Sequence, residues 1–326
     1  MRLPGERPRA ERDLSVIVVN WNTRELLRAC LTSLERHLAS VDHEIVVVDN
    51  ASSDGSADMV TADFSAVRLV RNSENVGFGR ANNQAMRLAE GRLLLLLNAD
   101  TVLTDDSVAR LVESIRGEKD IGVAQCRLML PDGRVQHTAY RFPSVALAAV
   151  ESLGLYKLLP KRRAGSILLS GFWDYDQERD VDWVAGAFML VPRRVFEATG
   201  GFDERSFMYG EDLEWCYRIR EQGWRIRYYP SASITHVDHA SAGLRWRDEE
   251  RLAICLRTQR DIFLERHGPA RTMALMTLRV VGAAVRIPYY SARRLLGGSR
   301  AAAYRDMQTY TFQSFRALVP LVLSRR

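Results

Sequence analysis

The sequence predicts an α/β fold with a Rossmann-like, mainly parallel sheet flanked by helices and a helical C-terminal extension. Three observations support this: short apolar runs that end abruptly in polar residues, helical segments between those runs, and arginine-bearing helical patterns after residue 243. Strands that alternate with helices in this way form βαβ units with right-handed crossovers. The 326 residues, 47% of them hydrophobic, suffice for one large core or two smaller ones.

Four apolar runs are the expected strands of the first half of the sheet. They span residues 14–19, 44–48, 67–70 and 93–97, and the last consists of five leucines. Parallel strands buried on both faces are continuous apolar runs, and open α/β sheets bind ligands at the carboxyl ends of their strands. The polar residues that follow these runs are therefore the first candidates for ligand contacts: Asn20, Asp49, Asn75, Asn98 and Asp100.

Helices are expected between these strands. Asn22 and Glu25 have the spacing of a capping box, and the stretch from Phe78 to Leu88 precedes Gly91, which suits a helix C-terminus. The glycine turn before this second helix, with Gly77, offers backbone amides suited to phosphates and hydroxyls. The alternative is a strand-to-helix turn in which the glycines serve backbone freedom alone.

The middle of the chain is less regular. Residues 131–133 predict a hairpin turn, and the poorly patterned stretch from there to about Asp180 is the expected place for acceptor or membrane contacts. Residues 181–191 predict one apolar strand, in which Gly186 permits close approach of a ligand or backbone. A helix that starts near Glu211 and Asp212 should then end at Gly223.

Charge is unevenly distributed along the chain. Residues 241–326 carry 16 arginines, no lysine and 6 acids, a net charge of +10, which leaves −4 for the first 240 residues. We expect helices at 251–266 and 271–287, the second ended by Pro288, and an anionic membrane surface as a partner of this region. The alternative is that these helices pack on the first 240 residues with their arginines in solvent.

Composition also bounds the class of protein. The four cysteines are scattered, which disfavours a zinc cluster or a disulfide framework, and no window has the roughly 18–20 apolar residues of a spanning helix. The first residues do not have the pattern of a secretory signal. We therefore expect a cytoplasmic protein, peripheral on the inner face of the membrane if it contacts one, whose oligomeric state the sequence leaves open.

The ordered motifs resemble the inverting family-2 glycosyltransferases of GT-A fold, most closely the rhamnosyltransferase-like branch. The resemblance covers about residues 14–243, which gives a flexible segment 1–13, a catalytic domain 14–243 and a helical extension 244–326. Within the catalytic domain, residues 14–130 are the expected nucleotide-sugar half and 131–243 the acceptor half. The motifs that carry the resemblance are Val48–Ser56, Asn75–Asn83, Asn98-Ala99-Asp100, Gly186-Ala187-Phe188 and Gly210-Glu211-Asp212.

The resemblance implies a role for several residues. Asp49 matches the carboxylate that accepts hydrogen bonds from a pyrimidine base. Asp100 matches the last acid of a DXD motif, which holds Mg2+ or Mn2+ against the donor diphosphate, although Asn98 replaces the first acid of that motif. His236 matches a C-terminal histidine that touches the metal or the diphosphate, and His239 is a competing choice.

Glu211 and Asp212 match the Glu-Asp pair of the family, in which the aspartate is the general base for the acceptor hydroxyl. Inversion needs one in-line attack with base and leaving group on opposite faces of the sugar. The alternative for both acids is a favourable position at a helix N-terminus, worth about 0.3–1 kcal/mol. The expected acceptor contacts are Trp183, Gly186 and Ala187, although a tryptophan packed in the core fits the sequence equally well.

The expected donor contacts are Asn20, Asp49, Asp54, Asn75, Gly77, Arg80, Asn83, Asn98 and Asp100. Asp54 also fits a purely structural role as a helix cap. The resemblance favours thymidine diphosphate rhamnose (dTDP-rhamnose) as the donor and a glycan or lipid-linked acceptor in polysaccharide or cell-wall assembly. The alternative is a non-catalytic nucleotide-sugar-binding or membrane-surface protein on a degenerate transferase fold.

Two further enzyme classes and one binding class are disfavoured by missing motifs. Residues 20–26 contain no glycine where a dinucleotide-binding dehydrogenase needs a glycine-rich turn, and no phosphate-binding loop of the NTPase type is present. No nucleic-acid-binding motif accompanies the arginines of the C-terminal region, so no nucleic acid partner is expected.

Overall fold

The computed structural model describes residues 12–237, 248–296 and 301–323. The chain forms two compact units. The first consists of Met1–Tyr140 and Asp174–Leu244, and the second of Arg141–Trp173 and Arg245–Arg326. This division differs from the sequence-based one at residues 141–173, which group with the C-terminal helices rather than with the acceptor half.

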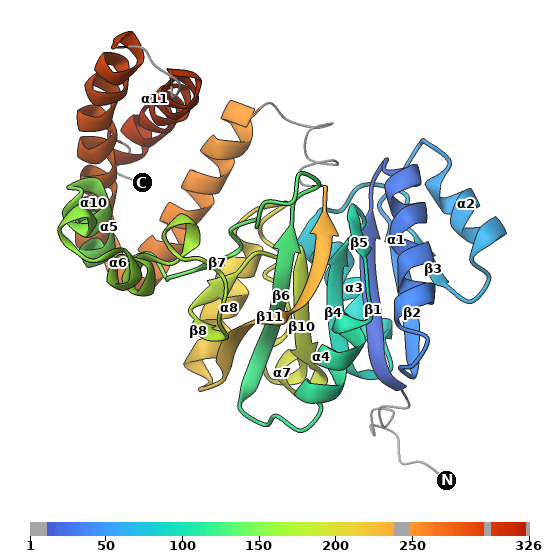
Figure 1. The fold of residues 1–326 in the computed structure, drawn as a ribbon. Coiled ribbons are helices and arrows are strands. Elements are labelled where there is room, and N and C mark those ends of the chain that lie inside the picture. The colour runs from blue at the N-terminus through green and yellow to red at the C-terminus, as the bar shows by residue number, and fades with distance from the viewer. Residues whose placement is uncertain (1–11, 238–247, 297–300, 324–326) are drawn as a thin grey trace. The chain divides into compact units, whose positions relative to one another are not determined.

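A nine-stranded sheet forms the centre of the first unit, in the order β3-β2-β1-β4-β10-β6-β11-β5 with β8 paired to β11 (Figure 1). Its first four strands are parallel: β1 (Arg12–Asn20), β2 (His43–Asp49), β3 (Arg68–Arg71) and β4 (Gly91–Asn98). Its remaining strands are β5 (Thr101–Leu103), β6 (Ile121–Met129), β8 (Arg179–Val181), β10 (Phe188–Pro192) and β11 (Arg225–His236). Among these, β6 and β11 are parallel, and the mixed, mainly parallel sheet confirms the predicted fold class.

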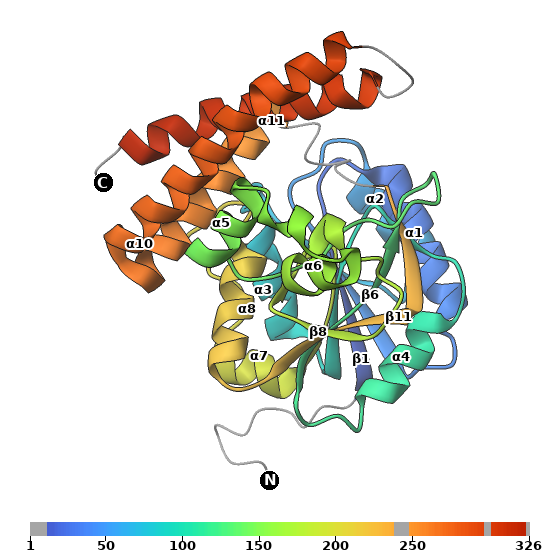
Figure 2. The ribbon, with the colours of Figure 1, turned by 60° about the vertical axis from the view of Figure 1, so that its left-hand side comes forward.

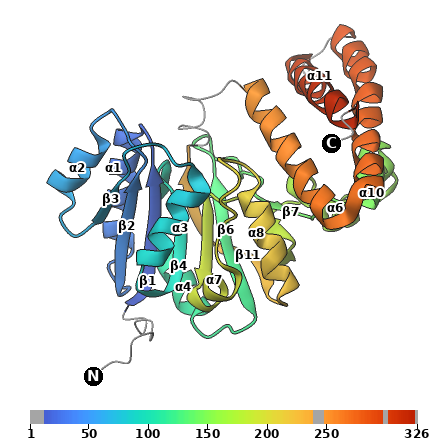
Figure 3. The ribbon, with the colours of Figure 1, turned by 180° about the vertical axis from the view of Figure 1, so that it is seen from behind.

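Helices cover both faces of this sheet. On one face, α1 (Arg24–His37), α2 (Ser56–Asp63) and α4 (Ser107–Ile115) pack on apolar side chains of β1, β2, β4 and β6. On the other lie α3 (Phe78–Leu88), α7 (Arg193–Thr199) and α8 (Glu211–Glu221) (Figure 3). The inner strands are buried on both sides because helices cover both, which explains the uninterrupted leucines of β4.

Three local predictions are wrong. The predicted strand 181–191 is divided into β8, β9 (Trp183–Val184) and β10, and β9 pairs with β7 (Ala139–Tyr140) in a separate two-stranded sheet. The N-cap of α1 is Thr23 and not Asn22, which has a left-handed φ of 52°. Gly91 does not end α3 but begins β4, where a Cβ would lie 2.3 Å from the backbone nitrogen of Ser15.

The predicted turn at 131–133 is confirmed, because Gly133 donates its amide hydrogen to Leu130 and has a φ of 82°. The predicted helix after Gly210 is confirmed as well. It begins at Glu211 and ends before Gly223, whose φ of 90° stops it.

The second unit is helical and has its own small core. It contains α5 (Val145–Ser152), η1 (Leu155–Leu158), α6 (Lys161–Leu168), η2 (Ser170–Phe172), α10 (Asp248–Leu295) and α11 (Ala301–Leu323). Helices α5, α10 and α11 lie beside one another (Figure 2). They bury Ala148, Phe263, Leu275, Met276 and Leu318 in this core. No helix in the described parts of the chain is long and apolar enough to cross a membrane.

The prediction for α10 is wrong at one of its two prolines, Pro288. The break in α10 lies at Gly268, with φ 77° and ψ 172°, and Pro269 follows as the first residue of the next helical segment, where a missing N–H costs nothing. Pro288 lies inside the helix, which continues to Leu295. The prediction that Pro288 ends the helix is therefore wrong.

Candidate active site

The carboxyl ends of β1 and β2 carry a hydrogen-bonded polar cluster around the buried Asp49. Asn20 Nδ2 donates to Asp49 Oδ1 at 3.0 Å, and the backbone amide of Ser52 donates to Asp49 Oδ2 at 3.0 Å. The amide oxygen of Asn20 in turn accepts from Thr23 Oγ1 at 2.7 Å. Asp49 is thus fixed in one orientation, and each of its oxygens keeps a second lone pair for a ligand N–H.

Asp54 lies beside this cluster, and its carboxylate accepts hydrogen bonds from the first residues of two helices. Its Oδ2 accepts from the backbone amide of Arg24 at 2.8 Å, and its Oδ1 accepts from the amide of Ser56 at 3.0 Å. Partial burial raises the pKa of Asp54, but the hydrogen bonds from Ser56 and Arg24 outweigh it and lower that pKa overall. The structure therefore gives Asp54 the capping role at α1 and α2 that the sequence left open.

Asn98, Asp100 and His236 meet where β4 and β11 end. His236 Nε2 lies 3.2 Å from Asp100 Oδ1 and 3.3 Å from Asn98 Nδ2. His236 and Asp100 are both buried, and the other ring nitrogen of His236, Nδ1, lies 2.7 Å from Gln136 Oε1. An amide oxygen only accepts hydrogen bonds, so Nδ1 carries a proton that it donates to Gln136, and Nε2 is the ring nitrogen that faces Asp100.

This arrangement fits a divalent cation. Two ligand atoms at right angles around Mg2+ or Mn2+ lie about 3 Å apart, close to the separation of His236 Nε2 and Asp100 Oδ1. An imidazole nitrogen and a carboxylate oxygen lie 3.2 Å apart, as His236 Nε2 and Asp100 Oδ1 do, only when a proton or a cation lies between them. Within the described residues, no group of three or more His, Cys, Asp or Glu side chains is placed to hold a metal ion by itself. The chain would therefore supply two such ligands plus the Asn98 carbonyl, which leaves coordination positions for phosphate oxygens and water.

Glu211 and Asp212 open α8, whose N-cap Gly210 has a left-handed φ of 90°. Asp212 Oδ2 accepts from the backbone amide of Gly186 at 3.1 Å, and Asp212 Oδ1 accepts from its neighbour Leu213 at 2.8 Å. The carbonyl oxygen of the next residue, Ala187, accepts from the amide of Asn98 at 3.1 Å. Consecutive residues of one loop thus hold Asp212 on one side and the Asn98–Asp100 segment on the other.

The two acids of α8 differ in their surroundings. Glu211 is buried, and within the described chain no hydrogen-bond partner contacts its Oε2. Burial, and then the charge of Asp212, raises the pKa of Glu211. Burial also raises the pKa of Asp212, but its two backbone hydrogen bonds oppose this rise. Burial therefore favours the protonated form of both acids, and at Asp212 the two backbone hydrogen bonds favour the carboxylate.

The start of α3 packs against the loop that leads to α8. Gly77 has a φ of 90°, and a Cβ there would lie 2.4 Å from the carbonyl oxygen of Phe207. A Cβ at Gly79 would lie 3.9 Å from Glu211 Cβ, so the glycine turn and the acid pair are neighbours. Asn75 accepts from the amide of Gly77 at 3.0 Å. The structure thus brings together the glycine turn and the acids that the sequence predicts for one site.

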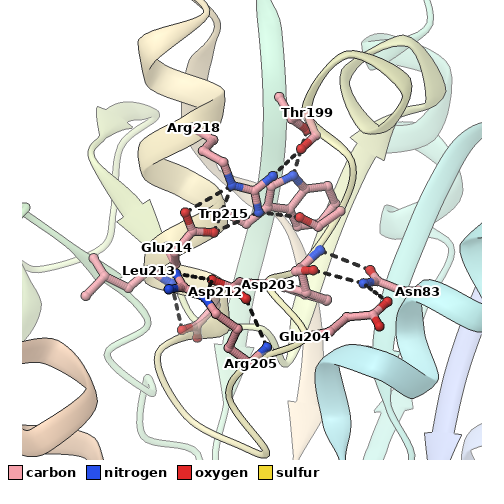
Figure 4. A network of polar contacts seen from close by, with 12 residues as sticks. Asn83, Thr199, Asp203, Glu204, Arg205, Asp212, Leu213, Glu214, Trp215 and Arg218 are labelled. Carbon is pink, nitrogen blue, oxygen red and sulfur yellow. Dashed lines mark hydrogen bonds and ion pairs between the residues drawn. The ribbon is translucent and has the colours of Figure 1, made fainter. Parts of the chain in front are cut away.

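Asn83 and Arg80 point to the loop before α8 instead of to a free pocket. Asn83 is buried, donates to the Phe202 carbonyl and to Glu204 Oε1 at 2.9 Å each, and accepts from the Phe202 amide (Figure 4). Arg80 Nε donates to the carbonyl of Glu204 at 3.2 Å. The amide of Asn83 is thus engaged in holding the loop, while the exposed Arg80 keeps further N–H groups for a ligand.

Trp183 and Ala187 flank the loop that contacts Asp212. Trp183 is partly buried and stacks on Tyr140, with ring centroids 4.3 Å apart. Ala187 is buried in the main core. His239, the competing histidine, lies outside the described residues.

Sequence reasoning missed three positioning residues. Buried Gln125 donates to the Ala185 carbonyl at 3.1 Å and holds the loop around Gly186, and Gln136 orients His236. Arg218 forms a 2.7 Å ion pair with Glu214 and donates to the carbonyls of Thr199 and Gly201 (Figure 4). A glutamine inside the apolar strand Ile121–Cys126 is a signal that could have revealed Gln125, whereas nothing in the sequence singles out Gln136.

Solved structures with the same architecture include sugar transferases. The mannosyltransferase PcManGT from Pyrobaculum calidifontis, in complex with GDP-Man and Mn2+, superposes with a TM-score of 0.56 at 18% identity and covers 99% of this chain and 90% of its own. S. aureus TarS 1-349 in complex with UDP-GlcNAc gives 0.52 at 16% identity, with 96% and 91% covered. The fold is thus the GT-A fold of glycosyltransferases.

Sequence comparison identifies the family. The model described as "Glycosyltransferase like family 2" matches residues 10–253, and the chain belongs to this family. The N-acetylglucosaminyl-diphospho-decaprenol L-rhamnosyltransferase of Mycobacterium tuberculosis (strain ATCC 25618 / H37Rv) is 28% identical over 240 residues, which is 64% of this chain and 73% of the relative. Rhamnosyltransferase WbbL of Escherichia coli (strain K12) is 25% identical over 235 residues, 69% of this chain and 83% of the relative.

Proposed function

We propose that this family-2 glycosyltransferase is a metal-dependent, inverting enzyme that transfers rhamnose from dTDP-rhamnose to a glycan or lipid-linked acceptor in polysaccharide or cell-wall assembly. The observation that carries the proposal is the Gly186–Ala187 loop, in which the amide of Gly186 holds Asp212 and the carbonyl of Ala187 holds the Asn98–Asp100 segment. A base and a diphosphate site held this way suit an in-line displacement at a sugar carbon.

Different residues of the donor half would bind the nucleoside and the diphosphate of the donor. Asp49, oriented by Asn20, accepts the N–H of a pyrimidine base, which selects thymidine or uridine over bases that present an acceptor there. Asp100 and His236 would hold the divalent cation, which neutralises the charge of the departing nucleoside diphosphate when it is bound. The exposed Arg80 and the amides of the glycine turn are further candidates for phosphate or hydroxyl contacts.

Asp212 would remove the proton from the acceptor hydroxyl. The backbone amides of Gly186 and Leu213 favour the ionised form of Asp212, and the amide of Gly186 fixes the direction of its Oδ2. Trp183, stacked on Tyr140 near this loop, presents an aromatic face suited to an acceptor sugar.

The names of the relatives support the choice of sugar and acceptor. The M. tuberculosis and E. coli relatives are both named rhamnosyltransferases, and the name of the first includes a diphospho-decaprenol acceptor. The Asp49 carboxylate can accept the N–H of a pyrimidine base, which agrees with a thymidine diphosphate donor.

The test is a calorimetric titration of dTDP-rhamnose, UDP-sugars and GDP-sugars, each with Mn2+, with Mg2+ and with chelator. We expect metal-dependent binding of dTDP-rhamnose that Asp100→Ala abolishes. Asp212→Asn should keep binding but lower turnover about 100- to 10,000-fold, because the general base is lost. Asp132→Asn, in the exposed hairpin turn, is the matched control and should change neither.

Two results would contradict the proposal. Binding of no nucleotide sugar under any metal condition would exclude the transferase activity as proposed, and full turnover by Asp212→Asn would exclude its role as base. The anomeric configuration of the product, followed by NMR, tests inversion separately, since retention would contradict a single displacement.

A further inference from the structure

The apolar surface of the described chain is concentrated in the helical unit. Of the fifteen large hydrophobic side chains that are exposed, thirteen belong to this unit. Isolated exposed hydrophobic residues are normal on any protein, but a concentration of this kind marks an interaction surface.

These residues include a regular row on α10. Met273, Thr277, Val281, Val285 and Tyr289 follow one another at four-residue spacing, and all five are exposed. We call them the outer row. Leu275, Met276 and Ala283 of the same helix are buried, the first two in the small core of the unit. The outer row is therefore a second apolar face, separate from the face that the core uses.

Basic side chains surround the C-terminal end of the outer row. Lys157 Nζ lies 5.5 Å from the centre of the Tyr289 ring, which places η1 beside this end of the row. In η1, Leu158 is 82% exposed, and Arg293 and Arg294 continue α10 one turn beyond Tyr289 as exposed residues. Exposed apolar groups and exposed cations thus alternate within one patch.

The two segments of this patch contain no acid. Residues 269–296 hold five arginines and residues 153–173 hold two arginines and two lysines, and neither segment has an Asp or Glu. Residues 153–173 carry Lys157, Lys161, Arg162 and Arg163 as their basic side chains. A second copy of the chain would bring like charges together at this face, which disfavours self-association.

We infer that the outer row and the surrounding cations dock this protein on an anionic phospholipid surface. Valine, methionine and tyrosine side chains enter the boundary between headgroups and acyl chains, while Lys and Arg side chains reach the phosphates. The row from Met273 to Tyr289 is about 24 Å long at 1.5 Å per residue, and it lies in the membrane plane. This docking is independent of the chemistry proposed for the catalytic unit.

The experiment is sedimentation of the full chain with vesicles of equal parts phosphatidylcholine and phosphatidylglycerol, compared with pure phosphatidylcholine vesicles. We expect binding to the mixed vesicles that weakens with added salt. Val285→Ser with Tyr289→Ser should lower the partition coefficient at least about tenfold through lost apolar burial. Lys157→Gln with Arg294→Gln should lower it about five-fold for each cation removed.

The matched control is Leu88→Ser with Arg92→Gln, an exposed apolar and an exposed basic residue of the catalytic unit, which should bind like wild type. Circular dichroism melts check that all variants are folded, and donor titration of the same proteins tests the proposed enzyme function separately. Equal binding by the variants and wild type, or no binding to mixed vesicles, would overturn the inference. It would also be overturned if the wild type were a dimer in solution that Val285→Ser with Tyr289→Ser dissociates.

Discussion

At the scale of single residues, His236 illustrates how a neighbour decides chemistry. An imidazole can present either nitrogen to a cation, and the hydrogen bond that the other nitrogen makes selects which one is available. Here Nδ1 of His236 donates a hydrogen bond to Gln136 Oε1 at 2.7 Å, so that Nε2 faces Asp100. Gln136 is a positioning residue, since it acts through His236.

Gln136→Leu should therefore weaken the binding of Mn2+ about 10- to 100-fold, measured by metal titration in the absence of any donor. Gln136→Glu keeps an acceptor for Nδ1–H and should restore most of the affinity. The exposed Gln222→Leu, at the end of α8, is the control. Unchanged Mn2+ affinity in Gln136→Leu would show that His236 is not a ligand or does not depend on this hydrogen bond.

Glu211 should make the stability of the protein depend on pH. Burial, and then the charge of Asp212, raises its pKa above the ordinary value of 4.5, so the folded state holds this proton to a higher pH than the unfolded chain does. Its contribution is full below about pH 4.5 and is lost as the pH rises through the raised pKa. Because glutamine does not ionise, Glu211→Gln should not lose this stability as the pH rises.

We therefore expect the melting temperature of Glu211→Gln to gain on that of wild type as pH rises, in thermal melts from acid to alkaline buffer. Glu113→Gln, an exposed residue of α4, should follow the wild-type profile. Parallel profiles for Glu211→Gln and wild type would mean that Glu211 ionises normally in the folded protein.

At the scale of elements, the glycine turn before α3 joins two parts of the site. Gly77 has a φ of 90° and a ψ of 169°, a combination accessible essentially to glycine alone, and it touches the backbone of Phe207. The turn thus sets the distance between α3 and the loop that leads to Glu211 at the start of α8. The unusual backbone conformation and the close approach of Phe207 thus both occur at Gly77.

Gly133 provides a control that separates these two effects. It also has a positive φ, of 82°, but a Cβ there would meet nothing within 4 Å. Gly133→Ala should cost about 1–2 kcal/mol of unfolding free energy, while Gly77→Ala should add about 1–3 kcal/mol for the backbone clash. Urea denaturation measures both, and equal losses would show that the loop at Phe207 yields freely.

At the scale of the whole molecule, the two compact units have separate apolar cores. Leu275 is buried in the core of the helical unit, and Leu275→Ala should destabilise that unit by about 2–5 kcal/mol. Hydrogen exchange should rise in α10 and α11 while β4 stays protected and donor binding is kept. Loss of protection in β4 would show that the two units unfold together.

Much of the catalytic unit could be predicted because its signals are local. The strands at residues 14–19, 44–48 and 93–97 are apolar without interruption, and a buried parallel strand needs nothing more specific. Phe78–Leu88 is helical with the predicted bounds. Asp49, Asp100 and Asp212 could be proposed as site residues because each follows a strand end or opens a helix within a recognisable motif.

The failures have equally physical reasons. Asn22 fits a capping box in sequence, but Asp54, thirty residues away, caps α1 from another loop. Gly91 fits a helix end, but the close approach of Ser15 explains why no side chain is tolerated there. Pro288 fits a helix stop, yet the helix continues, since a proline at a solvent-exposed position costs one backbone hydrogen bond and does not prevent further turns.

The sequence by itself determined the α/β class, the family and the side chains able to carry out the chemistry, because apolar period, strand-end polarity and motif order are properties of neighbouring residues. Only the tertiary structure decided that Gln136 orients His236, that Asn83 holds a loop and that residues 141–173 pack with the C-terminal helices. These are contacts between residues far apart in the chain, and no local pattern encodes which distant partner a polar side chain will meet.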